Sequence, residues 1–159
     1  MKIKIYAIGY LKEMYLKLAI NAYVERLKPY TNLQIIEVAD EAIGNNPNAK
    51  DIEIAKNKEG KKVLKLLKKN EYLVGLDLTN KQLTSEQFAV YLQDKLVAGR
   101  ANLSFVIGGS HGLSKELKGR CQDWLALSKM TFLHQMTRLI LLEQIYRAFK
   151  INRNEPYHK

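Results

Sequence analysis

Apolar and polar residues along the chain follow two different periods. Short runs that are continuously apolar or alternate at every second residue are separated by longer segments with the three-to-four residue spacing of helices. The short runs predict strands at Lys2–Ile8, Leu33–Val38, Tyr72–Leu78, Leu103–Ile107 and around Leu125. The longer segments predict helices at Leu11–Leu27, Asp51–Lys69, Thr84–Ala98, Lys115–Arg120 and Gln135–Asn152. Strands that alternate with helices favour an α/β fold, with a parallel sheet flanked by helices on both faces.

Residues with strong turn or capping preferences indicate where several of these elements end. Pro29 stops the first helix, and Thr84 with Gln87 has the spacing of a helix-capping box. Gly99 occupies a typical position just after a helix. Gly60 lies in the middle of the second helix, which it weakens by about 1 kcal/mol relative to alanine.

The first predicted helix has apolar residues at a helical spacing, and the last predicted helix has a wider apolar stripe. In the first helix these positions are Leu11, Tyr15, Leu18, Ala19, Ala22 and Val24. In the last helix they are Leu139, Leu141, Leu142, Ile145, Tyr146, Ala148 and Phe149, which cover about half of the circumference. The stripe of the last helix fits either the core of the chain or a dimer interface.

The overall composition fits one globular domain. The chain has 159 residues, 47% of them hydrophobic, with no apolar run near the ~20 residues that span a bilayer. No signal-peptide pattern follows Met1. The single cysteine, Cys121, cannot form an internal disulfide, which fits a reducing cytosol. We therefore expect a single cytoplasmic domain over residues 1–159 with no membrane partner.

Positive charge is concentrated in two segments. The chain has 26 Lys and Arg against 16 Asp and Glu, a net charge of +10. Between Lys50 and Lys69 there are 8 lysines and 3 acidic residues, and the segment from Arg138 to Lys159 is also basic. Such concentration is typical of proteins with a phosphate-rich partner. Lysine-rich helices also serve solubility alone, so charge leaves both interpretations open.

Two loops that follow predicted strands are candidates for a ligand site. The first is Gly108-Gly109-Ser110-His111-Gly112, and the second runs from Ser128 to Met136. In open α/β sheets ligands bind outside the carboxyl ends of strands, and glycines there allow a close approach of the backbone. The first loop is not a P-loop, because no Gly-Lys-Ser/Thr follows. A plain strand-to-helix turn and ordinary loop packing explain the two segments about as well.

The last helix and the tail carry further candidate residues. Arg138 lies on the apolar face of the helix, where a buried charge needs a partner unless the side chain extends to solvent. In the tail, cationic side chains can bind phosphates, Tyr157 can stack on a base and His158 can titrate near neutral pH. A frayed basic tail is the competing interpretation. The three histidines and one cysteine are scattered, so we expect no metal site.

Five segments together resemble the RlmH family, SPOUT-class methyltransferases of large-subunit ribosomal RNA. The resemblance covers essentially the whole chain. The segments are Phe105-Val106-Ile107-Gly108-Gly109, Ser128-Lys129-Met130-Thr131-Phe132, His134-Gln135-Met136, Glu143-Gln144-Ile145-Tyr146-Arg147-Ala148-Phe149 and Tyr157-His158-Lys159.

The resemblance implies a fold, a reaction and an assembly. The fold is a parallel α/β sheet with a deep C-terminal trefoil knot, and the cofactor is S-adenosylmethionine. The reaction is methylation at N3 of a pseudouridine in a hairpin of 23S rRNA in assembled ribosomes. The protein is a homodimer in which the tail of one subunit completes the site of the other. The implied cofactor contacts are Leu76, Gly108, Leu127, Ser128, Lys129, Met130, Thr131 and Phe132.

Within this framework the basic tail takes part in the reaction. Our hypothesis is that His158, or water held beside it, accepts the proton from N3 of the pseudouridine. The residues expected to contact RNA are Arg138, Arg147, Arg153, Tyr157 and Lys159. Two other functions compete with the methyltransferase: a non-catalytic RNA-binding module on the same basic faces, and a small-molecule nucleotide-binding enzyme without an RNA partner.

Overall fold

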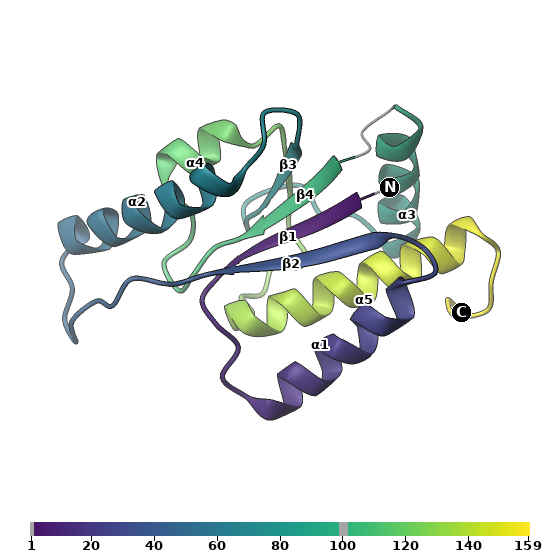
Figure 1. Cartoon of the computed structure of the whole chain (residues 1–159), viewed down its shortest axis with the longest axis horizontal. Coiled ribbons are helices and arrows are strands. Elements are labelled where there is room, and N and C mark those ends of the chain that lie inside the picture. Colours follow the sequence, from purple (N-terminus) through teal and green to yellow (C-terminus); the bar gives the residue numbers. More distant parts are fainter. Residues whose placement is uncertain (1, 99–101) are drawn as a thin grey trace.

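Five parallel strands form one sheet, which confirms the predicted α/β class (Figure 1). The computed structural model describes residues 2–98 and 102–159, so Gly99, the expected helix end, lies outside the described residues. The order across the sheet is β2-β1-β4-β3-β5, with every pair parallel. The strands are β1 (Lys2–Ile8), β2 (Asn32–Val38), β3 (Tyr72–Leu76), β4 (Asn102–Ile107) and β5 (Asp123–Leu125). The helices are α1 (Met14–Leu27), α2 (Ala49–Leu66), α3 (Ser85–Val97), α4 (Lys115–Arg120) and α5 (His134–Asn152).

Helices cover both faces of the sheet, because the central strands are apolar on both sides. Figure 1 shows α2 and α4 over one face and α1, α3 and α5 over the other. Along β1, Ile3 and Ile5 belong to the core under α1, α3 and α5, whereas Tyr6 and Ile8 belong to the core under α2 and α4. This alternation follows from the two-residue period of a strand.

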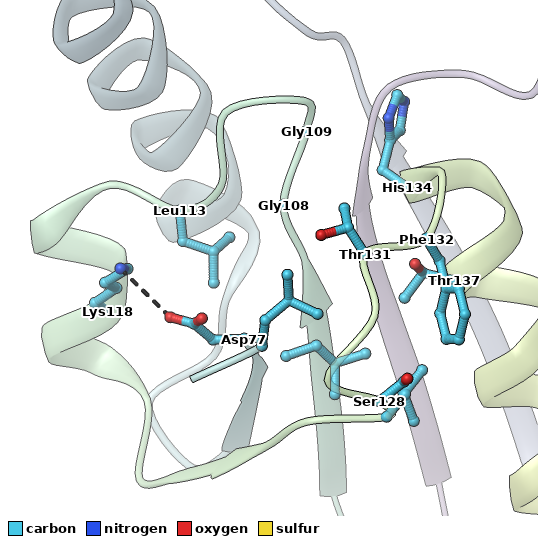
Figure 2. A pocket seen from close by; sticks show the side chains of 13 residues that line it. Asp77, Gly108, Gly109, Leu113, Lys118, Ser128, Thr131, Phe132, His134 and Thr137 are labelled. Carbon is cyan, nitrogen blue, oxygen red and sulfur yellow. Dashed lines mark ion pairs between the residues drawn. The ribbon is translucent and has the colours of Figure 1, made fainter. Parts of the chain in front are cut away.

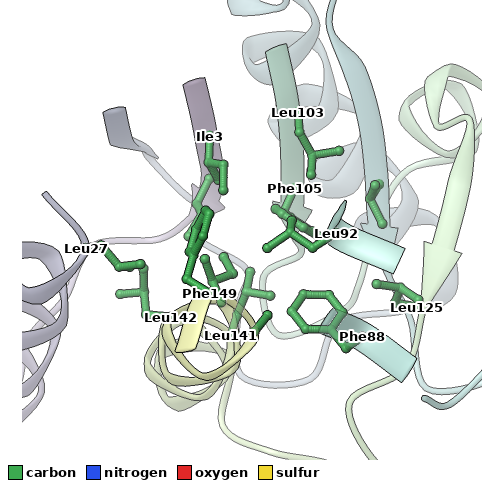
Figure 3. Packing of buried hydrophobic residues seen from close by; sticks show 14 of the residues in the cluster. Ile3, Leu27, Phe88, Leu92, Leu103, Phe105, Leu125, Leu141, Leu142 and Phe149 are labelled. Atoms are coloured by element: carbon green, nitrogen blue, oxygen red, sulfur yellow. The ribbon is translucent and has the colours of Figure 1, made fainter. Parts of the chain in front are cut away.

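The apolar stripe of α5 packs into the core of its own chain. Leu141, Leu142, Ile145 and Ala148 are fully buried, and Figure 3 shows α5 side chains meeting those of the strands and of α3. Of the two interpretations that the sequence left open, the core is therefore correct for this stripe. A dimer interface has to be sought elsewhere on the surface.

Helix α1 is apolar on two faces, and the expected positions do not all face the core. It begins at Met14 rather than at Leu11, and its buried residues are Leu16, Ile20 and Leu27. The expected positions Tyr15 and Leu18 are 58% and 64% exposed. Periodicity alone could not choose between the two faces, because both carry large apolar side chains.

Capping residues define the ends of the two helices that follow β2 and β3. The Asn48 and Asp51 side chains form a capping box, so α2 starts two residues earlier than predicted. The box of Thr84 and Gln87 forms as predicted. Strand β3 ends at Leu76 rather than at Leu78, because the chain turns away there.

Gly60 is required by packing, although it weakens the helix that contains it. A Cβ atom at this position would overlap the Ser114 hydroxyl and lie 3.1 Å from the Ser114 Cβ. Ser114 in turn caps α4 by accepting a hydrogen bond from the Leu117 N–H, at 3.2 Å. The missing side chain therefore allows α2 to approach the start of α4, and the propensity cost is offset by this contact.

We expect Gly60→Ala to destabilise the protein by about 1–3 kcal/mol, because overpacking outweighs the gain in helix propensity. Gly119→Ala in α4 is the matched control, since nothing lies within 4 Å of its added Cβ. That substitution should leave the free energy of unfolding unchanged or raise it by up to about 1 kcal/mol. Urea denaturation measures both, and a stabilised Gly60→Ala variant would contradict the packing argument.

Candidate functional site

The carboxyl ends of β3, β4 and β5 meet at a cleft with about 710 Å³ of space, including the part open to solvent (Figure 2). One wall comes from the loop between β5 and α5, and another from the turn after β4. The lining residues are Leu76, Asp77, Leu78, Gly108, Gly109, Leu113, Lys118, Leu127, Ser128, Thr131, Phe132, His134 and Thr137. The cleft lies at the edge of the sheet where ligands bind in open α/β folds.

Six of the eight residues implied as cofactor contacts line this one cleft, although they come from three separate parts of the chain. The other two, Lys129 and Met130, are in the same loop but do not line the cleft. The Met130 side chain is 74% exposed, and Lys129 is also exposed. Their side chains therefore do not reach the cleft, and the Met130 N–H donates to the Ser128 hydroxyl at 2.9 Å.

The glycines after β4 form a closed turn that also borders the cleft. The Gly112 N–H donates a hydrogen bond to the Gly109 carbonyl at 3.1 Å, and Gly112 has a φ of +86°. A Cβ on Gly108 would lie 2.8 Å from the Gly112 carbonyl carbon. The backbone of the turn itself therefore requires glycine at both positions. The same turn brings bare backbone to the cleft.

The loop from Leu127 to Phe132 offers both an apolar surface and unpaired backbone donors. The N–H groups of Leu127, Thr131 and Phe132 make no hydrogen bond to another described residue. Leu76 and Leu113 add apolar surface from the opposite side. A flat ring with hydrogen-bonding edges, such as a purine, fits a cleft with these properties.

Two charged residues in the cleft were missed from the sequence. Asp77 follows β3, and its carboxylate lies 3.6 Å from the Lys118 ammonium on α4 (Figure 2). Burial would raise the pKa of Asp77, but hydrogen bonds from Thr79 and the charge of Lys118 outweigh it, and the pKa is lowered. Asp77 therefore stays ionised in the cleft. Asp77 and Lys118 are 41 positions apart, so no sequence pattern predicted this ion pair.

His134 stands at the start of α5 on the rim of the cleft. Burial lowers its pKa, and the positive charges of Arg138 and Lys12 act in the same direction, while Asp40 opposes them. The ring lies 3.3 Å from the point where a Cβ on Gly9 would be, so Gly9 is kept small by this contact. The imidazole is therefore held in its neutral form more firmly than a free histidine.

Arg138 is the charged residue that fixes this end of the sheet. Its side chain is 1% exposed. One terminal nitrogen donates to the Glu37 carboxylate at 2.8 Å, and the other donates to the Gly9 carbonyl at 3.0 Å. The expectation that Arg138 contacts RNA does not fit this arrangement, because its guanidinium is buried and engaged by its own chain. Arg138 positions α5 against β1 and β2.

A family model described as "Predicted SPOUT methyltransferase" matches residues 1–158. The chain belongs to the SPOUT methyltransferase family. It is 51% identical to a protein of Clostridioides difficile (strain 630) and 52% identical to one of Clostridium novyi (strain NT). It is 48% identical to a protein of Halothermothrix orenii. Each comparison covers all of both chains, and each relative is named "Ribosomal RNA large subunit methyltransferase H".

A SPOUT methyltransferase needs a methyl donor. Within residues 2–98 and 102–159, no group of three or more His, Cys, Asp or Glu could hold a metal ion. In the same ranges, no helix is long and apolar enough to cross a membrane.

The tail of this methyltransferase lies against its own chain, away from the cleft. His158 contacts Glu86 at 2.7 Å, and its other ring nitrogen lies 3.3 Å from Arg147. The Tyr157 hydroxyl donates to Glu143 at 3.0 Å, and Arg147 pairs with the same carboxylate. Arg147 is 13 residues beyond His134, which lines the cleft at the start of α5, and this corresponds to about 20 Å along the helix. His158 is thus not among the residues that line the cleft of its own chain.

The remaining basic residues of the tail are spread around the end of α5. The Arg153 guanidinium lies 4.6 Å from the centre of the Tyr30 ring, and Lys150 pairs with Glu155 at 2.6 Å. Lys159 is exposed. Arg147 lies over the Tyr157 ring and Arg153 over the Tyr30 ring, so the tail is packed against tyrosines rather than extended.

Replacing Glu37 with alanine should destabilise the protein by about 3 kcal/mol, because it leaves the buried Arg138 charge without its carboxylate. Glu37 also accepts a hydrogen bond from the Leu11 N–H at 3.0 Å, which would be lost. Glu25→Ala removes an exposed ion pair with Lys28 and should cost less than about 1 kcal/mol. Chemical denaturation of the two variants checks this difference, and equal losses would argue against a structural role for Arg138.

Proposed function

We propose that the protein is an S-adenosylmethionine-dependent methyltransferase that acts on N3 of a pseudouridine in a hairpin of 23S rRNA in assembled ribosomes. The observation that carries the proposal is the cleft between Gly108 and Leu127–Phe132, in a chain of the SPOUT methyltransferase family. The substrate is supported by the relatives at about 50% identity over the whole chain, which are named after large-subunit ribosomal RNA. Acting on ribosomes, the protein would work in the cytoplasm.

The described residues fit the cofactor by their chemistry. Leu76, Leu127 and Phe132 provide apolar surface for the adenine ring, and the free N–H groups of the loop can bond its edge. S-adenosylmethionine supplies a methyl group activated by its sulfonium. The main task of the protein is then to position the two reactants and to exclude water. The deep trefoil knot implied for this part of the chain stays a prediction.

In our proposal a second copy of the chain completes the site. Exposed apolar side chains gather where the segment before α1 meets the start of α5, and a hydrogen bond from the Lys12 N–H to Gln135 at 3.2 Å joins the two segments. They are Tyr10, Met14, Tyr15, Leu18, Leu133 and Met136, each at least 36% exposed. A patch of this kind is typical of a protein interface. We propose that it forms the homodimer interface, instead of the buried stripe of α5.

In the proposed dimer the tail of one subunit serves the cleft of the other. His158 would accept the proton that leaves N3 of the pseudouridine. Arg147, Arg153 and Lys159 would hold RNA phosphates, and Tyr157 would stack on a base. Because the tail of a single chain is held near Glu86, its role in catalysis depends on the partner.

We expect Phe132→Ala to raise the Kd for S-adenosylmethionine about 10- to 100-fold, because the loss of one aromatic wall removes 1.5–3 kcal/mol of apolar burial. Met130→Ala in the same loop is the control, since its side chain points away from the cleft. Calorimetric titration measures both affinities. No binding by the wild-type protein, or an equal effect of the two variants, would contradict the placement of the cofactor.

His158→Ala should abolish single-turnover methylation of ribosomes at neutral pH while cofactor binding is retained. Mixing this variant with Phe132→Ala, at a cofactor concentration that leaves Phe132→Ala inactive, tests whether the tail acts in trans. A mixed dimer then contains one intact cleft completed by one intact tail, so random mixing should restore about a quarter of the wild-type activity. Full activity of His158→Ala alone would exclude it as the base. A mixture without recovered activity would indicate that each tail serves its own cleft.

A further inference from the structure

We propose that α2 carries a second RNA-binding surface, separate from the cleft and the tail, which docks the protein on the phosphate backbone of ribosomal RNA. This surface is a line of four lysines, Lys50, Lys58, Lys61 and Lys65, here called the lysine stripe. This inference rests on the proposed function, because it concerns how that enzyme would hold its large substrate. The cleft is too small to determine where a whole ribosome binds.

The lysine stripe occupies one narrow side of α2. At about 100° per residue its four lysines fall within about 80° of the helix circumference, with Ile54 between them. All four lysines are exposed, and the opposite side of α2 carries the buried residues Ala55 and Val63. With a rise of 1.5 Å per residue, the stripe is about 22 Å long. It is therefore a straight row of positive charges on a rigid element.

None of the four lysines is neutralised by a described residue. They take part in no ion pair or hydrogen bond of residues 2–98 and 102–159, in contrast to Lys62, which pairs with Glu41 at 2.6 Å. Two of the three acidic residues of α2 are engaged elsewhere, and the third, Glu53, is exposed and forms no ion pair with a described residue. Asp51 is engaged in the capping box, and Glu59 is buried and accepts a hydrogen bond from the Glu41 N–H at 3.0 Å. The stripe thus has no ion pair with a described residue and is open to an external partner.

The pattern differs from that of a helix face that serves solubility alone. Such faces usually intersperse both signs of charge, often in pairs three or four residues apart. In the stripe, Lys58, Lys61 and Lys65 follow one another at these spacings with the same sign, which destabilises a helix by a few tenths of a kcal/mol per pair. Lys61 and Lys65 form no ion pair with a described residue, and Glu41, whose pKa is lowered by Lys62 and less strongly by Lys58, offsets only part of this repulsion. A polyanion along the stripe would remove it.

The position of α2 relative to the cleft suits a substrate that contacts both. Figure 1 shows that the first turns of α2 extend beyond the carboxyl ends of the strands, the edge of the sheet at which the cleft lies. Lys50 is in these first turns, and Lys58, Lys61 and Lys65 continue the row along the second half of the helix. The packing of Gly60 on Ser114 fixes α2 to the segment that follows the glycine turn of the cleft. RNA held by the stripe would therefore be held at a fixed offset from the site of methyl transfer.

The test compares two variants that each lose three positive charges. Lys58→Gln, Lys61→Gln and Lys65→Gln together remove most of the stripe. Lys28→Gln, Lys69→Gln and Lys81→Gln together remove three exposed lysines that lie outside the stripe, the cleft, the tail and the proposed dimer interface. Because the two variants have the same net charge, a difference in binding between them cannot come from the total charge. Thermal unfolding checks that both variants fold.

We expect the stripe variant to bind assembled ribosomes with a weaker salt dependence than the control. Loss of three phosphate contacts should reduce the slope of log K against log salt by about 2, at 0.7 per contact. In the methylation assay the KM for ribosomes should rise about tenfold or more, with kcat and cofactor affinity unchanged. Slopes and KM values equal to those of the control would overturn the proposal. Binding of the stripe to anionic phospholipid vesicles, with ribosome binding unaffected by the variant, would also overturn it in favour of a membrane partner.

The proposed function and the stripe can fail separately in this design. If wild-type protein binds ribosomes without methylating them, the proposed function fails, and the difference in binding slope still decides the role of the stripe. If wild-type protein methylates ribosomes and the stripe variant matches the control, only the stripe is excluded. A double variant of Lys61→Glu and Lys65→Glu should weaken binding further than the corresponding glutamine variant, because it adds repulsion to the loss of attraction.

Discussion

The buried guanidinium of Arg138 is the contact on which the cleft depends. A charge in this position is tolerated only with partners, and they come from Glu37 on β2 and the Gly9 carbonyl after β1. The first turn of α5 is thereby fixed to the carboxyl ends of two strands. The loop from Leu127 to Phe132 is then stretched between β5 and this fixed turn, which gives the cleft its wall. Stability of the fold and shape of the site are thus coupled through one side chain.

The periodicity of the sequence was sufficient to predict where strands and helices lie, but not which face of each helix is buried. Strands and helices lie where the pattern predicts them, because each core-facing position recurs at the period of its element. The end of an element was missed where a side chain decides it, as with the Asn48 cap of α2. The orientation of α1 could not be predicted, because the helix is apolar on both faces. The need for glycine at position 60 could not be predicted either, because it comes from a contact with Ser114, which is distant in sequence.

The candidate site was predictable to the extent that it consists of strand ends. Gly108 and the loop after Leu127 were found because loops at the carboxyl ends of parallel strands converge. The ion pair of Asp77 with Lys118 was not found, because it depends on how α4 packs beside β3. The charge of the chain pointed to a phosphate-rich partner without saying where it binds. The structure separates the basic residues into those that hold the chain together, such as Arg138, and those that remain free, such as the lysine stripe.

Transfer of a labelled methyl group to purified ribosomes, followed by mapping of the labelled nucleotide, tests the central claim most directly. The proposed function predicts label at N3 of one pseudouridine in a hairpin of 23S rRNA, with assembled ribosomes preferred over free rRNA. Label in another nucleotide, or no transfer under conditions in which the protein binds both S-adenosylmethionine and ribosomes, would contradict it.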